Sequence, residues 1–142
     1  MAPEAKFNLA DVRAGKLRTV SDERGALVIL EQGEQLEFAA QRLFFVHPAK
    51  VGEARGGHAH IACRQVLICI SGRCTTLVDD GRDKQVFTME GPDSALSVPT
   101  GIWTAQSYET RETVLAVLCD RVYEEEDYIR DYAEFLKYRG VT

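Results

Sequence analysis

The chain contains a series of short apolar runs, rich in β-branched and aromatic residues and separated by turn residues. Such runs are typical of β-strands. The strands are expected at residues 26–30, 42–46, 64–70, 74–78, 84–89, 95–99, 102–108 and 113–119. Because the runs follow one another regularly, with no helical pattern between them, the sequence predicts an antiparallel sandwich or barrel.

The tail of the chain follows a different period. Its apolar positions recur at helical spacing, with acidic residues before them and basic residues after them. This arrangement suits the helix dipole, so we expect a C-terminal α-helix over about 124–139 that ends before Gly140. The acidic run at 124–127 is interpreted as a solvated helix start, and a partner-binding patch is the alternative.

Composition and charge limit the classes of partner. A length of 142 residues predicts one domain, 1–142, with its barrel at about 20–120. The net charge of -5 disfavours nucleic acid and anionic membranes as partners. No apolar run is long enough to span a bilayer and no secretory signal is seen, so a cytoplasmic location is expected. The four cysteines form no CxxC pair and are interpreted as reduced core residues.

Two histidines carry the candidate chemistry. His58 and His60 would point to the same face of a strand, where they could bind a metal or transfer protons. With Gly52, Gln65 and Gly72 they form the frame G-x5-H-x-H-x4-Q-x6-G. This frame resembles the first motif of the cupin superfamily, which has an acidic metal ligand where this chain has glutamine. The resemblance implies an all-β, single-domain cupin fold, a double-stranded β-helix or jelly-roll barrel.

A second segment resembles the other cupin motif but lacks its ligand. Pro99 and Gly101 match that motif, and Thr104 stands where the family has its third histidine. Two histidines and a neutral amide are a poor set for a divalent transition metal, so no metal or other cofactor is expected. The imidazoles would then act as acid and base on a carbon next to a carbonyl, as in a ketosugar. Arg55 is the nearest candidate to stabilise the developing enolate.

Further segments resemble one branch of the cupins, the sugar 3,4-ketoisomerases. They are DERG at 22–25, RLFFV at 42–46, RGGHAH at 55–60, QVLIC at 65–69, DDG at 79–81, PTGIW at 99–103 and EEDYIR at 125–130. The resemblance implies a metal-independent isomerase that moves the ketone of a dTDP-linked 4-keto-6-deoxy sugar from C4 to C3, for 3-amino-3,6-dideoxyhexose synthesis. It carries His58 and His60 over as catalytic residues. It also implies a homodimer that exchanges an N-terminal strand, here the segment before Leu30.

The substrate's diphosphate needs local positive charge on this acidic chain. Arg24, Arg42 and Arg55 are the candidates, because they lie in the resembling segments. Gln65 and Trp103 are further candidate substrate-binding residues, and Trp103 either lines the barrel mouth or fills the core.

Phe44 and Phe45 stand where such isomerases often have tyrosines. A hydroxyl that holds the sugar must then come from elsewhere. Tyr108 and Tyr123 are possible substitutes, although packing is the more ordinary role for both.

Three other functions are open. The chain could be a small metal-dependent cupin enzyme that uses His58, His60 and Gln65, or a sugar-nucleotide-binding cupin without turnover. An epimerase acting beside the ketone would use the same enolate chemistry.

Overall fold

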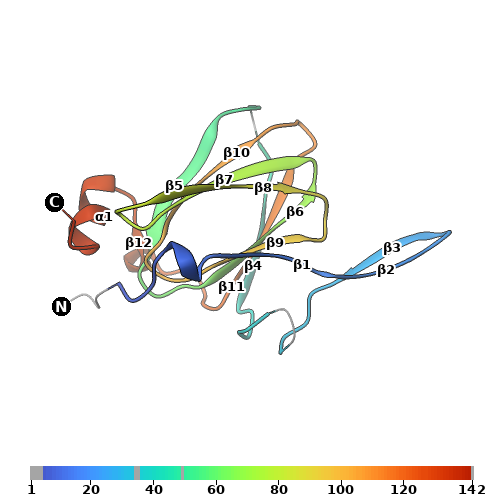
Figure 1. Cartoon of the computed structure of the whole chain (residues 1–142), viewed down its shortest axis with the longest axis horizontal. Coiled ribbons are helices and arrows are strands. Elements are labelled where there is room, and N and C mark those ends of the chain that lie inside the picture. Colours follow the sequence, from blue (N-terminus) through green and yellow to red (C-terminus); the bar gives the residue numbers. More distant parts are fainter. Residues whose placement is uncertain (1–4, 34–35, 49, 142) are drawn as a thin grey trace.

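The computed structural model describes residues 5–33, 36–48 and 50–141, and within them two five-stranded antiparallel sheets form a jelly-roll barrel (Figure 1). One sheet has the order β1-β9-β6-β11-β4, with β1 (Arg13–Lys16), β9 (Ser94–Val98), β6 (Gln65–Ser71), β11 (Val114–Cys119) and β4 (Arg42–Val46). The other has the order β12-β5-β10-β7-β8, with β12 (Tyr128–Ile129), β5 (Ala54–His60), β10 (Trp103–Tyr108), β7 (Arg73–Asp79) and β8 (Lys84–Glu90). The predicted all-β cupin barrel is confirmed. Positions 1–4 and 142 of the predicted domain lie outside the described residues.

The core lies between the two sheets and is filled by alternate residues of their strands. Leu67 and Cys69 of β6, and Leu115, Val117 and Cys119 of β11, point into it because successive side chains of a strand face opposite sides. All four cysteines are buried and free, as the sequence predicted.

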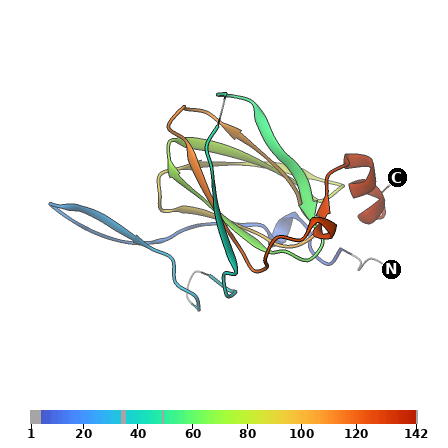
Figure 2. The same ribbon diagram turned by 180° about the vertical axis from the view of Figure 1, so that it is seen from behind.

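The N-terminal part of the chain departs from the predicted barrel limits. β2 (Arg18–Asp22) and β3 (Gly25–Ile29) pair with each other as a separate two-stranded sheet, and Figures 1 and 2 show this hairpin projecting from the barrel. The apolar run at 26–30 therefore forms a strand, but outside the barrel. Val20 and Leu27 are 56% and 62% exposed, so the apolar pattern here does not mark burial against the chain's own core.

The C-terminal helix is shorter than predicted. Of the range 124–139, only α1 (Tyr132–Tyr138) is α-helical, and it is preceded by a 3-10 turn, η2 (Glu125–Asp127), and by β12. The chain stays extended at β12 because Tyr128 and Ile129 pair with His60 and Ala59 of β5. Tertiary pairing thus overrides the helical spacing of these residues.

Helix α1 covers one end of the barrel. Asp131 caps its start by accepting a hydrogen bond from the amide of Glu134 at 3.0 Å. Phe135 is fully buried, and its ring lies 5.4 Å from that of Trp103. A second 3-10 turn, η1 (Leu9–Asp11), precedes β1. Within the described residues, no helix is long and apolar enough to cross a membrane.

Candidate active site

A cavity of about 620 Å³ opens into the barrel between β4, β5, β10 and β11. Three of the predicted site residues, Arg55, His58 and Gln65, line it. The remaining lining residues are Phe44, Phe45, Val46, His47, Gly56, Leu67, Thr104, Gln106, Tyr108, Leu115, Val117, Tyr128 and Arg130. The wall is therefore apolar on the β4 and β11 side and polar on the β5 and β10 side, a combination typical of small-molecule sites.

The two predicted catalytic histidines lie together on β5, but they differ in access to the cavity. The centroids of the His58 and His60 rings are 4.9 Å apart, and the rings are nearly perpendicular at 87°. His58 lines the cavity, whereas His60 is only 5% exposed and lies behind it. His58 is therefore the histidine that can touch a ligand.

The backbone before the pair explains one glycine of the segment RGGHAH at 55–60. Gly56 has a φ of +75°, and a Cβ there would lie 2.6 Å from Oε1 of Gln106. Only glycine fits this left-handed position without strain. The register of β5 and β10 also shifts between Thr104 and Gln106, which brings the Gly56 backbone against the Gln106 side chain.

The surroundings of His58 keep its ring neutral. Burial is the main cause that lowers the pKa of His58 to about 4; the neighbouring His60 and the Arg130 guanidinium add to the lowering, and the charge of Asp127 opposes it. A histidine with this pKa carries a free lone pair at neutral pH. It can therefore accept a proton without first losing one.

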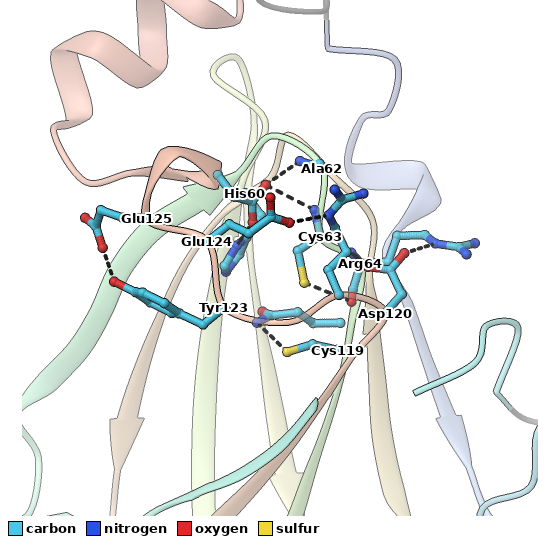
Figure 3. Close-up of polar contacts among 12 residues, drawn as sticks. His60, Ala62, Cys63, Arg64, Cys119, Asp120, Tyr123, Glu124 and Glu125 are labelled. Atoms are coloured by element: carbon cyan, nitrogen blue, oxygen red, sulfur yellow. Dashed lines mark hydrogen bonds and ion pairs between the residues drawn. The ribbon is translucent and has the colours of Figure 1, made fainter. Parts of the chain in front are cut away.

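His60 is held by a buried carboxylate that the sequence did not reveal as a site residue. Its Nδ1 lies 2.6 Å from Oδ2 of Asp127, while Oδ1 of Asp127 accepts hydrogen bonds from the amides of Ala62 at 2.6 Å and Cys63 at 3.2 Å (Figure 3). Burial alone would raise the pKa of Asp127, but these hydrogen bonds outweigh burial and lower it. Asp127 is therefore ionised at neutral pH.

Tyr128 and Arg130 are two further cavity residues, and the apolar spacing of the tail had predicted a helix at their positions. The Tyr128 ring centroid lies 5.1 Å from that of His58 and 4.4 Å from that of His60. The Arg130 guanidinium lies over the Tyr128 ring at 4.2 Å and pairs with Glu125 at 3.1 Å. Both residues lie in the segment EEDYIR at 125–130, which resembles the 3,4-ketoisomerases. The helical spacing of the tail nevertheless gave no indication that their side chains face the cavity.

Gln65 and Arg42 meet at a buried thiol. Cys119 Sγ accepts hydrogen bonds from Nε2 of Gln65 at 3.4 Å and Nη2 of Arg42 at 3.5 Å. The thiol of Cys63 and these two donors lower the pKa of Cys119, and the same pairing raises the pKa of Cys63. The Arg42 guanidinium also lies 5.7 Å from the Tyr123 ring centroid and does not itself line the cavity.

Two predicted substrate-binding residues lie away from the cavity. Trp103 packs against α1, with its ring centroid 5.2 Å from that of Tyr132, and it does not line the cavity. Arg24 lies at the tip of the β2–β3 hairpin, where it is 85% exposed and pairs with Asp22 at 2.8 Å.

The two tyrosines considered as substitutes are placed differently. Tyr108 lines the cavity but is 2% exposed, and burial raises its pKa to about 12. Tyr123 is 56% exposed, and its hydroxyl donates to Glu125. Of the two, only Tyr108 borders the cavity.

The donor set of the cupin frame does not fit a divalent metal. Nδ1 of His60 is engaged by Asp127, Gln65 turns its amide nitrogen toward Cys119, and Thr104 offers only a hydroxyl. His60, Cys63 and Asp127 do bring three potential ligand atoms within 4.8 Å of one another. Both oxygens of that carboxylate are, however, already accepting hydrogen bonds.

The jelly roll, with its histidine pair on the strand beside the cavity, defines a cupin-fold protein. Comparison with known families narrows this class. The model of the FdtA family, described as WxcM-like, C-terminal, matches residues 10–140, and the chain belongs to this family.

Characterised relatives support the assignment. The chain is 36% identical over 121 residues to the TDP-4-oxo-6-deoxy-alpha-D-glucose-3,4-oxoisomerase of Aneurinibacillus thermoaerophilus, a match that covers 85% of this chain and 87% of that protein. It is 31% identical to a 3,4-ketoisomerase from Helicobacter canadensis, with a TM-score of 0.87 and coverage of 92% and 98% of the two chains.

A third relative has been solved with ligands. QdtA, a sugar 3,4-ketoisomerase from Thermoanaerobacterium thermosaccharolyticum, is 26% identical, with a TM-score of 0.89 and coverage of 94% and 97%. Its structure contains TDP, and a histidine-to-asparagine mutant of the same enzyme was solved with TDP-4-keto-6-deoxyglucose.

Proposed function

We propose that this protein is a dTDP-sugar 3,4-ketoisomerase, which moves the ketone of a dTDP-linked 4-keto-6-deoxy sugar from C4 to C3. The observation that carries the proposal is the placement of a neutral His58 on the wall of the cavity. Family membership and the named activities of the relatives agree with it.

The chemistry requires two proton movements that balance. His58 takes the proton from C3, and the electron pair left behind forms a C3–C4 double bond as charge moves onto the C4 oxygen. The C4 oxygen gains a proton and the C3 hydroxyl loses one. The electron pair then returns from the C3 oxygen to form the new ketone, while C4 takes the proton from the His58 imidazolium. No charge or atom is gained overall.

The cavity offers hydrogen-bond donors for the charge that develops on oxygen. Thr104, Tyr128 and Arg55, which belong to its lining, carry two hydroxyls and a guanidinium as such donors. Donors fixed beside a developing oxyanion are usually a large part of enzymatic rate enhancement. We assign this role to these groups, in place of the Lewis acid that a metal-binding cupin would use.

Two arginines at the cavity would bind the diphosphate of the substrate through their positive charge. Arg55 and Arg130 line the cavity, and Arg130 also pairs with Glu125 and lies over the Tyr128 ring. Gln65 contacts the sugar directly in this proposal. Arg42 acts through Cys119 and Gln65, and Trp103 supports β5 at Gly57, where a Cβ would lie 3.3 Å from the Trp103 ring.

We further propose a homodimer in which the β2–β3 hairpin crosses to the partner. Its strands pair with no other strand in the described residues, and Val20 and Leu27 are exposed. Apolar side chains on a projecting hairpin are a typical docking element. In this arrangement Arg24, at the hairpin tip, reaches the partner's cavity. Arg24 could then bind the substrate's diphosphate there, as the sequence predicted.

The dimer is tested by replacing residues 18–29 with a short glycine linker. Light scattering should show a dimer for the intact chain and a monomer for the shortened one. A monomeric intact chain at micromolar concentration contradicts the proposal.

A cytoplasmic location remains part of the proposal. It is supported by the four buried free thiols, since disulfides are rare in reducing compartments.

The activity is tested by proton NMR of the chain incubated with dTDP-4-keto-6-deoxyglucose. A 3-keto product should form, and the His58→Asn variant should form it at least about 100-fold more slowly. Thermal stabilisation by dTDP confirms that the variant remains folded and binds the nucleotide. Stabilisation by dTDP without turnover in the intact chain would instead show a binding protein, and equal rates in both proteins would refute the role of His58.

A further inference from the structure

We propose that Asp127 is a positioning residue for the isomerisation, because it fixes the tautomer of His60 and places a negative charge behind His58. The inference rests on the proposed function. It concerns a residue that lies outside the cupin motifs and does not line the cavity.

Asp127 is held rigidly by its own contacts. Its backbone oxygen accepts from the amide of Ile61 at 2.9 Å, and its Oδ1 accepts from the amides of Ala62 and Cys63. Both the main chain and the side chain are therefore tied to the turn that follows β5. Oδ2 is left to face Nδ1 of His60 at 2.6 Å.

The contact with Oδ2 decides which nitrogen of His60 carries the proton. An ionised carboxylate can only accept hydrogen bonds, so Nδ1 must be the donor. In a neutral ring, Nε2 is then unprotonated. Nε2 is buried and has no hydrogen-bond partner among the described residues. Buried polar atoms are rarely left without one, and such atoms are found at functional sites.

The same carboxylate acts on the proton carrier. The negative charge of Asp127 favours the protonated form of His58, in opposition to burial and to positive charge nearby. His58 becomes an imidazolium once it has taken the C3 proton, so this charge stabilises the intermediate state. Asp127 thus acts through both histidines without touching the substrate.

The Asp127→Asn variant separates this role from a purely structural one. An asparagine oxygen can still accept from the amides of Ala62 and Cys63, while its NH2 group donates to Nδ1 and forces the Nε2–H tautomer. We expect kcat to fall by about 10²- to 10³-fold, with KM changed less than about twofold. Glu126→Gln, an exposed acid-to-amide change one residue away, should leave kcat unchanged.

The tautomer itself is read by long-range 1H–15N NMR of labelled protein. The intact chain should show His60 protonated at Nδ1, and Asp127→Asn should show it protonated at Nε2. An Nε2–H tautomer in the intact chain, or a kcat within about threefold of the intact chain in Asp127→Asn, would overturn the inference. Because the spectrum of the intact chain needs no turnover and no variant, it decides the tautomer even if the variant fails to fold. Absence of isomerisation by the intact chain would count against the proposed function alone.

Discussion

Burial of a neutral His58 beside the cavity should make the stability of the protein depend on pH. The His58→Asn variant removes the titrating ring and keeps a polar side chain of similar reach. The ring is surrounded by His60, Arg130 and Asp127. Since these neighbours are present in both proteins, the difference between the two reports the titration of His58.

The magnitude follows from the two pKa values of His58. The pKa is 6.5 in the unfolded chain and about 4 in the folded one. The folded state therefore resists protonation, and the stability from His58 is fully present above pH 6.5 and is lost progressively as the pH falls from 6.5 to about 4. At about 1.4 kcal/mol per pH unit, the full effect is roughly 3 kcal/mol, most of which is lost between pH 7.5 and pH 4.5.

Urea denaturation at a series of pH values measures this loss. The free energy of unfolding should fall more steeply in the intact chain than in His58→Asn, by about 2–3 kcal/mol over that range. His47→Asn, which removes an exposed histidine, should follow the intact chain within about 0.5 kcal/mol. If the intact chain and His58→Asn show parallel curves, the ring is not held neutral by burial and the reasoning fails.

Three other predictions concern activity and packing. The acid limb of kcat/KM should have its midpoint near pH 4, because His58 is protonated there, and a midpoint near 6.5 would show an ordinary exposed histidine. Phe135→Ala should lower the free energy of unfolding in urea by about 3–5 kcal/mol, since the ring is fully buried under α1, and a loss below about 1 kcal/mol would mean that the helix is not docked. Gly72→Ala should cost about 2 kcal/mol or more in the same assay, because its φ is +74° and a Cβ would lie 2.7 Å from Cα of Thr113. Gly140 has the same φ but open space around it, so Gly140→Ala should lower the free energy of unfolding by less. Equal losses at the two glycines would show that close packing around Gly72 does not contribute.

The barrel strands could be predicted because their apolar residues alternate or run continuously between turn signals. β4, β7, β8 and β11 lie within a residue of the expected ranges. β1 was missed, since its residues Arg13–Lys16 are exposed and carry no apolar alternation. The tail was misassigned because Tyr128 and Ile129 fit a helical spacing, and only their pairing with β5 makes them a strand.

Some residues of the candidate site could likewise be predicted from the sequence and others could not. His58, Arg55 and Gln65 could be found because they occupy fixed positions in a motif, and a strand places such positions on known faces. Asp127 could not, because 67 residues separate it from His60 and its acidic neighbours suggested a solvated helix start. A contact of this kind is set by the folded chain, and the segment EEDYIR at 125–130 does not by itself show that Asp127 faces His60.

The measurement that tests the central claim most directly uses dTDP-4-keto-6-deoxyglucose carrying deuterium at C3, followed by NMR in ordinary water. Our account predicts that the intact chain releases deuterium from C3 as the ketone moves, with the label found at C4 or in the solvent, and that His58→Asn keeps the label at C3 at least about 100-fold longer. Deuterium lost from C3 equally fast in both proteins, or a substrate whose ketone stays at C4 while C5 exchanges, would contradict it.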